Sequence, residues 1–304
     1  MSRLFFLLSS WPLAVLHPLG SVLGWLAYLL SPSYRRHVRA HTRQAGLGRW
    51  QRWQAVAHAG RMVAELPRLW AWPREVPLGA RVRWEGAEAI DQALDESRGL
   101  LILTPHLGCF EMVAMAYAER FGPRAPMTAL YRPARQAWLA QVMIDARSRP
   151  GLNTSPATLA GVRAMLRALK RGETVGILPD QVPPEGMGQW APFFGRPAYT
   201  MTMAPKLVAQ TGCAVVLMRG ERLGVWARWR QGCEYVVHAQ RVDAAMAAQL
   251  ASADTAQSTL TLNQLMESTI MQAPEQYLWG YNRYKAPKAE ILTSATSGSP
   301  VQGE

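Results

Sequence analysis

The N-terminal segment limits the folds available to this chain more than any other stretch. Residues 4–30 contain no Asp, Glu, Lys or Arg, and the run is long enough to cross a bilayer core of about 30 Å. Pro12, His17 and Pro18 interrupt it and weaken the case for one straight helix. We therefore expect residues 1–32 to form a membrane anchor, spanning or re-entrant, with a buried or interfacial hairpin as the alternative.

The residues after this segment indicate an orientation. SPSYRRHVR follows, with Arg35, Arg36 and Arg39, and no small-residue cleavage site precedes it. A secretory signal peptide is therefore a poor fit. Because basic residues beside an apolar segment favour the cytoplasmic side, we expect the rest of the chain to lie in the cytoplasm.

The charge indicates an anionic partner. The net charge is +12, the pI is about 10.2, and only four of the 33 basic residues are lysines. A genome of high GC content, which prefers arginine codons, explains part of the Arg/Lys ratio but not the net charge. Nucleic acid, an anionic membrane and an acidic protein all fit. The three cysteines, Cys109, Cys213 and Cys233, are too far apart for a disulfide framework or a zinc site, and we expect Cys109 to be a packing residue.

Strand-like and helix-like segments alternate after residue 33, which predicts an α/β fold. The short spacing of strands after residue 213 suggests a mixed sheet, so we expect an α/β/α sandwich over residues 33–288. Residues 289–304 have the composition of a disordered tail. Strands are expected at 81–85, 99–105, 125–133, 174–181, 213–223, 225–230 and 234–240, and helices at 33–72, 86–97, 108–121, 134–147, 155–173, 202–211 and 255–271.

A histidine and a glutamate mark the most promising chemistry. His106 directly follows the apolar strand at 99–105, and Glu111 falls early in the next predicted helix. A carboxylate bonded to one imidazole nitrogen raises the basicity of the other, which can then take a proton from a substrate hydroxyl. The spacing does not match the HExxH zinc motif. A helix-capping histidine beside an unrelated surface glutamate is the alternative.

These residues carry a family resemblance. HLGCFE, residues 106–111, matches the H-x4-D/E motif of the glycerolipid acyltransferase superfamily. The chain more closely resembles the lauroyl/myristoyl family of lipid A biosynthesis acyltransferases, over roughly residues 1–288. The stretches that carry this likeness are TALYRP (128–133), GILPDQ (176–181), APFFGRPAYT (191–200) and PEQYLWGYNRYK (274–285).

The resemblance implies an activity and its partners. The family moves a fatty acyl chain from acyl carrier protein to a hydroxyl of a lipid A precursor, with no metal and no cofactor. Acyl carrier protein is acidic and the acceptor carries phosphates, so both fit a basic, arginine-rich chain. The implied location is the inner membrane, with the catalytic domain facing the cytoplasm. The apolar N-terminal segment, and the absence of a helix-turn-helix, zinc or RNA-binding signature, argue against a nucleic-acid partner.

The resemblance also implies roles for single residues. His106 becomes the general base and Glu111 its orienting carboxylate. Arg132 binds an acceptor phosphate or stabilises the oxyanion, unless it forms a surface salt bridge. Asp180 and Gln181 shape the floor of the site, unless Asp180 caps a helix or pairs with an arginine.

Other stretches leave alternatives open. Phe193, Phe194 and Gly195 line the acyl pocket or form a core turn with two buried aromatic side chains. The sequence departs from the family at 280–282 and at PPEGMGQW (183–190). An acceptor such as an ornithine lipid or a lysophospholipid, or acyl-CoA as donor, therefore remains open. A non-catalytic basic membrane-surface protein is the non-enzyme alternative, which the intact pair of His106 and Glu111 disfavours.

Overall fold

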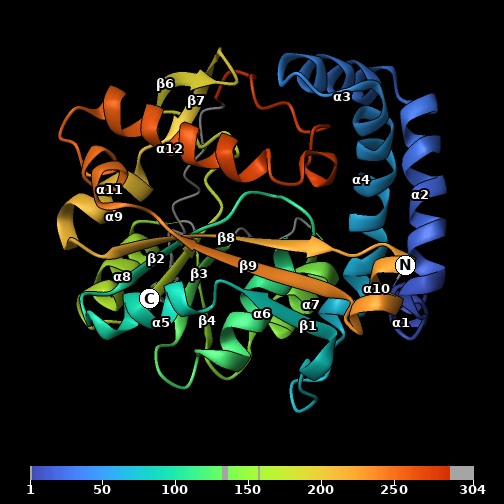
Figure 1. Ribbon diagram of the computed structural model, residues 1–304, viewed down its shortest axis with the longest axis horizontal. Coiled ribbons are helices and arrows are strands. Elements are labelled where there is room, and N and C mark those ends of the chain that lie inside the picture. Colours follow the sequence, from blue (N-terminus) through green and yellow to red (C-terminus); the bar gives the residue numbers. More distant parts are fainter. Residues whose placement is uncertain (1, 132–135, 157, 288–304) are drawn as a thin grey trace, which may run out of the picture.

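The computed structural model describes residues 2–131, 136–156 and 158–287, and the described part is built around a seven-stranded sheet (Figure 1). The strands of this sheet are β1 (Val82–Glu85), β2 (Leu100–Leu103), β3 (Met127–Tyr131), β4 (Leu152–Pro156), β5 (Thr174–Ile177), β8 (Ala214–Arg222) and β9 (Tyr235–Arg241). Their order is β1-β9-β8-β2-β5-β3-β4, with β2 at the centre. All neighbouring pairs are parallel except β8 and β9, so the predicted mixed sheet is confirmed. The predicted tail at 289–304 lies outside the described residues.

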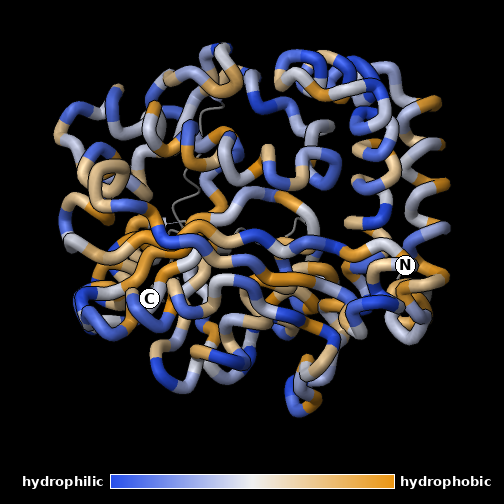
Figure 2. The backbone as a smooth tube through the Cα atoms, in the orientation of Figure 1, coloured by the Kyte–Doolittle hydropathy of each residue, from blue (hydrophilic) through white to orange (hydrophobic). Residues whose placement is uncertain are grey.

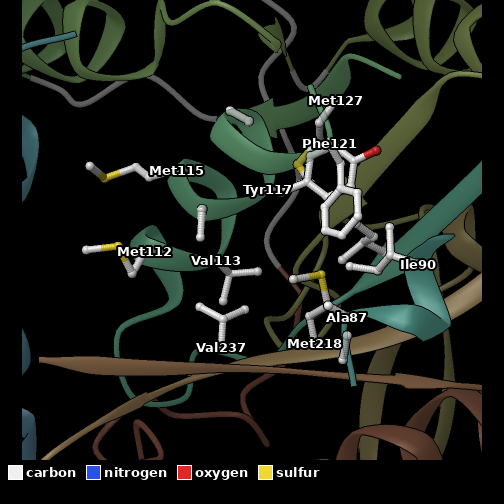
Figure 3. Close-up of a cluster of buried hydrophobic side chains, with 14 of the residues drawn as sticks. Ala87, Ile90, Met112, Val113, Met115, Tyr117, Phe121, Met127, Met218 and Val237 are labelled. Carbon is white, nitrogen blue, oxygen red and sulfur yellow. The ribbon is translucent and has the colours of Figure 1, made fainter. Parts of the chain in front are cut away.

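Two hydrophobic cores lie on opposite faces of the sheet. Successive side chains of a strand point to opposite faces, so Leu100 and Ile102 enter one core while Leu101 and Leu103 enter the other. The first core also takes side chains from α5 (Glu88–Asp95) and α6 (Phe110–Arg120), and Figure 3 shows α6 residues gathered with Met218 and Val237 of the sheet. The second core contains α8 (Leu159–Lys170), α9 (Met203–Thr211) and α12 (Thr255–Ile270). The α/β/α sandwich expected from the sequence is therefore confirmed.

Several elements differ from the sequence prediction. A separate hairpin of β6 (Gly188–Phe193) and β7 (Arg196–Met201) packs against α12, and α11 (Ala244–Leu250) precedes that helix. Residues 225–230, predicted as a strand, belong instead to helix α10 (Val225–Gln231). Glycines bracket this helix, and Gly232 ends it in a left-handed conformation with φ of 68° that suits glycine.

The N-terminal region forms a layer of helices at one end of the sheet (Figure 1). These helices are α1 (Ser2–Ser9), α2 (Leu13–Leu30), α3 (Pro32–Gln44) and α4 (Arg49–Trp70). The single helix predicted at 33–72 is thus two helices, separated at residues 45–48, and α4 continues through Pro67. Further along the chain, α7 (Ala137–Arg147) contacts α4.

Helix α2 is packed along α4 through glycines. A Cβ added at Gly20 would lie 2.7 Å from the carbonyl oxygen of Gly60, and one added at Gly24 would lie 2.4 Å from that of Val56. The helix is long and apolar enough to cross a membrane by length and composition, yet one side of it is occupied by α4. Figure 2 shows much of the outer edge of α2 coloured as hydrophobic. The helix carries an exposed apolar stripe of Val15, Leu19, Val22, Leu23, Leu26, Leu29 and Leu30. Any bilayer that contacts α2 must meet this stripe.

A buried ion pair joins the helical layer to the sheet. Both Glu65 of α4 and Arg222 of β8 have side chains that are 1% exposed, and the carboxylate oxygens accept hydrogen bonds from Arg222 Nη2 at 2.5 Å and Nε at 2.8 Å. His17 of α2 and the Tyr235 hydroxyl also bond to Glu65, each at 3.1 Å. Burial alone would raise the pKa of Glu65, but the Arg222 charge and the hydrogen bonds from Arg222 and His17 together outweigh it and lower that pKa to about 2.

The same arginine holds the loop after β2. Arg222 Nη2 donates to the carbonyl oxygen of Gly108 at 2.9 Å, and the Gly108 N–H donates to the carbonyl oxygen of Gln276 at 3.0 Å. Gly108 has φ of 58°, and a Cβ there would lie 2.0 Å from the carbonyl oxygen of Gly220. Only glycine fits such a position, so the loop that carries His106 is fixed on several sides.

We predict that Gly60→Leu destabilises the protein. Its Cβ would lie 1.9 Å from the carbonyl oxygen of Gly20, so α2 and α4 must separate, at a cost above the ~1–3 kcal/mol typical of overpacking. Thermal unfolding in detergent measures this effect. Gly224→Ala is the control, since a Cβ there meets nothing within 4 Å and φ is −69°. Equal unfolding midpoints for the two variants would contradict the tight helix contact.

We also predict that Glu65→Gln costs about 3–5 kcal/mol of unfolding free energy, because it leaves the buried Arg222 charge without a counter-ion. The double variant Glu65→Met/Arg222→Met should be more stable than this single variant. Glu173→Gln, which breaks a surface pair with Arg171, should stay near wild type.

This ion pair also predicts a pH dependence. The ordinary pKa of the carboxyl is 4.5 and its folded pKa is about 2, so its stabilisation is complete above about pH 5 and is lost as the pH falls towards 2. Chemical denaturation at several pH values measures the loss. An acid response unchanged in the Met/Met variant would rule out Glu65 as its source.

Candidate active site

The site lies where two neighbouring parallel strands end. His106 follows β2 and Asp180 follows β5, and these strands pair directly. Their carboxyl ends therefore meet at one edge of the sheet, where open α/β sheets place ligands. Asp180 makes two hydrogen bonds with His106. Its Oδ1 lies 2.7 Å from His106 Nδ1, and its Oδ2 accepts a hydrogen bond from the His106 backbone N–H at 2.9 Å.

These contacts determine the state of the imidazole. Because Asp180 is a buried acceptor, we assign the proton to Nδ1, which leaves Nε2 with a free lone pair. Gln181 Nε2 lies 3.1 Å from His106 Nε2 and donates to that lone pair. The His106 side chain is 17% exposed and lines a cavity, although its ring is held firmly.

The charge of Asp180 is stabilised by its partners. Burial would raise the pKa of this carboxyl, but the His106 ring and backbone N–H outweigh burial, so the pKa lies below its ordinary value. The adjacent loop is held by the Tyr281 hydroxyl, which accepts the Val182 N–H at 2.9 Å. Asp180 therefore stays ionised at neutral pH on a fixed backbone.

Glu111 occupies a different position from the one predicted. It lies in the first turn of α6, but its Oε1 accepts a hydrogen bond from Arg147 Nη2 at 2.5 Å. Among the described residues, the carboxylate that bonds to the His106 ring is that of Asp180, and Glu111 makes no such bond. The predicted orienting contact from Glu111 is therefore corrected: the helix directs this side chain towards the end of α7, where an arginine neutralises it.

A cavity of about 410 Å³ opens at His106, within the size range of small-molecule sites. Its polar lining among the described residues comes from His106, Glu111, Arg147 and Gln181. The rest of the lining is apolar: Trp70, Phe110, Leu130, Met143, Val162, Ile177, Leu178, Val182, Pro183, Pro184, Met187, Met201 and Met203. A basic nitrogen at the wall of an apolar cavity suits a long hydrocarbon substrate with one reacting polar group.

The remaining predicted site residues have other positions. Phe193 is buried in the second core, with its ring centroid 5.2 Å from the Cζ atom of Arg283. The ring centroids of Phe194 and Trp279 are 5.5 Å apart. Phe194 and Gly195, with φ of 46° and 75°, form the turn between β6 and β7. This placement favours the core-turn alternative over the acyl pocket. Arg132 lies outside the described residues.

Cys109 is a packing residue in this structure. Its side chain is buried, and burial raises the pKa of its thiol well above the ordinary value. A nucleophilic thiolate is therefore disfavoured at this position.

Sequence reasoning did not identify Arg147 or Arg222. Arg147 ends the helix predicted at 134–147, and Arg222 lies near the end of the strand predicted at 213–223. A signal for Arg222 existed, since a charge inside an otherwise apolar strand of a buried sheet requires a partner. Nothing in the sequence marks Arg147 as the partner of Glu111.

Comparison with known proteins gives the family. The family model described as bacterial lipid A biosynthesis acyltransferase matches residues 52–286. The lipid A biosynthesis palmitoleoyltransferase of Escherichia coli (strain K12) is 27% identical over 231 residues, which cover 74% of this chain and 68% of that protein. The lipid A biosynthesis lauroyltransferase of the same organism is 26% identical over 232 residues, covering 74% and 69%. A lipid A biosynthesis acyltransferase of Haemophilus influenzae is 25% identical over 202 residues, covering 66% and 58%.

The matched region contains the strands, the loop of His106 and the closing segment that holds it. This chain belongs to the bacterial lipid A biosynthesis acyltransferases.

Proposed function

We propose that the protein transfers a fatty acyl chain from acyl carrier protein to a hydroxyl of a lipid A precursor, with His106 as the general base. The observation that carries this proposal is the imidazole at the cavity, with Nδ1 bonded to a buried carboxylate and Nε2 on the open side. Family membership supports acyl transfer to lipid A. The net charge of +12 supports an acidic carrier protein as the donor.

The reaction follows from the tautomer. The acceptor hydroxyl displaces Gln181 from Nε2, gives its proton to His106, and its oxygen attacks the thioester carbonyl carbon. Asp180 stabilises the imidazolium without taking its proton. The tetrahedral intermediate collapses, the carbon–sulfur bond breaks, and the imidazolium returns the proton to the leaving thiolate.

Glu111 and Arg147 act as a unit in this proposal. Arg147 supplies the cationic side chain among the described lining residues, and Glu111 fixes its direction at the cavity wall. A guanidinium so placed suits an acceptor phosphate or the oxyanion of the intermediate. Arg132 keeps the same two roles as a proposal.

The location extends the same proposal. The apolar stripe of α2 supports contact with a membrane, and the basic residues of α3 that follow support a cytoplasmic orientation at the inner membrane. The acceptor lipid and the enzyme then share one bilayer.

We predict that wild-type protein, incubated with acyl-carrier-protein thioesters and membrane extracts, adds the mass of one acyl chain to a lipid A precursor. His106→Ala should lower the rate by about 10²–10⁴, because it removes the base. Lipid mass spectrometry measures the product, and circular dichroism verifies that the variant is folded. Acylation of a different lipid, or use of acyl-CoA alone, would replace the acceptor or donor; near-normal turnover by His106→Ala would refute the base assignment.

We further predict that Asp180→Asn and Glu111→Gln affect different kinetic constants. An amide at residue 180 can donate to Nδ1 and so favours the wrong tautomer, which should lower kcat by up to ~10⁴ with little change in KM. Glu111→Gln should mainly raise KM for the acceptor, because it releases Arg147. Kinetics at varied acceptor concentration separate the two effects. If Glu111→Gln abolishes kcat while Asp180→Asn remains active, Glu111 and not Asp180 is the carboxylate that orients His106.

A further inference from the structure

Helix α10 exposes its apolar side chains to solvent, unlike a surface helix of a soluble protein. Val225, Trp226 and Trp229 lie on one face, and they are 61%, 81% and 80% exposed. The side chain of Arg228 turns inward instead. Surface helices of soluble proteins place apolar residues against the core and charges outside, so this polarity is inverted.

The inversion is fixed by specific contacts. Arg228 Nε donates to the carbonyl oxygen of Leu223 at 2.8 Å, and Arg228 Nη2 contacts His17 Nδ1 of α2. Ala227 packs against a small buried cluster that contains Leu223 and Cys233. The helix cannot rotate its tryptophans inward without breaking these contacts.

The exposed face lies next to the N-terminal helices. Figure 1 shows α10 beside α1 and the start of α2. Val225 and Trp229 line a surface hollow of about 610 Å³ together with Leu13, Ala14, Arg68 and Arg81. The exposed face of α10 thus lies beside the start of α2, just before the apolar stripe that begins at Val15.

The charged side chains around α10 favour an anionic lipid surface as its partner. Arg81 and Arg230 are exposed, and Arg68 donates from Nη1 to the Trp11 carbonyl at 3.1 Å. Glu234 is the carboxylate among the described residues that line the hollow, so the cations outnumber it. Tryptophan prefers the headgroup level of a bilayer, and arginine beside it reaches lipid phosphates. A protein partner would explain the tryptophans, but not their position beside the start of the apolar α2 stripe.

We propose that α10 is a second membrane contact, with Trp226 and Trp229 inserted at the headgroup level of an anionic bilayer and the neighbouring arginines on lipid phosphates. This inference rests on the membrane contact proposed for α2, but not on which lipid is acylated or on His106.

A fluorescent label tests the contact directly. The native cysteines are buried, so Val225→Cys in the full-length protein can be labelled selectively with an environment-sensitive dye. Ala253→Cys, exposed in the loop between α11 and α12, is the matched control. On vesicles of phosphatidylcholine with phosphatidylglycerol, the label at 225 should shift to shorter wavelength and be quenched by nitroxide lipids, while the label at 253 should not change.

Two tryptophan pairs sharpen the test. Trp226→Ala/Trp229→Ala should remove most of the shift at residue 225, whereas Trp50→Ala/Trp53→Ala, an exposed pair on α4, should leave it intact. Equal loss in both pairs would overturn the proposal, as would an unshifted label on protein that floats with the vesicles. A shift that appears without vesicles at high protein concentration would identify a second copy of the chain as the occupant. An equal shift on pure phosphatidylcholine would overturn the anionic specificity.

Discussion

The buried pair of Glu65 and Arg222 is the contact on which the rest of the arrangement depends. It joins a helix of the N-terminal layer to a strand of the central sheet, and the same guanidinium reaches the loop behind His106. Desolvating two charges costs several kcal/mol for each ion, so a pair of this kind is a weak source of stability unless every donor and acceptor is used. Here His17 and Tyr235 also bond to Glu65, while Arg222 donates to the Gly108 carbonyl and its Nη1 lies 3.4 Å from His58 Nδ1. The network therefore specifies one position of the helical layer relative to the loop that carries His106.

The site combines a firmly held imidazole with an adaptable apolar wall. His106 is held through its ring and its backbone N–H by Asp180, and its carbonyl accepts the Leu278 N–H at 3.2 Å. The cavity wall, by contrast, contains methionines and prolines, and methionine fits irregular apolar shapes. Fixed chemistry beside a compliant pocket suits an enzyme family whose named relatives transfer different acyl chains, palmitoleoyl and lauroyl.

The sequence predicted the parts of the structure that depend on local pattern. The apolar run at 99–105 gave the central strand, and His106 was expected at its end. The partner of His106 was assigned to Glu111, the nearer carboxylate in the chain, whereas the pairing of β2 with β5 brings Asp180 closer in space. That pairing is a long-range property that spacing does not encode. The strand predicted at residues 225–230 was wrong for another reason. Tryptophan and valine favour strands, but the contacts of Arg228 and the flanking glycines fix a helix in this context.

The hydrogen bond from Gln181 to the imidazole has a consequence for side reactions. Nε2 offers a single lone pair, and in this structure Gln181 occupies it. A molecule that uses His106 as a base must first compete with that amide. A lipid acceptor brings binding energy from its chains and phosphates to offset the exchange, whereas a water molecule brings none. In the proposed reaction, this glutamine therefore favours acyl transfer over hydrolysis of the thioester before an acceptor arrives.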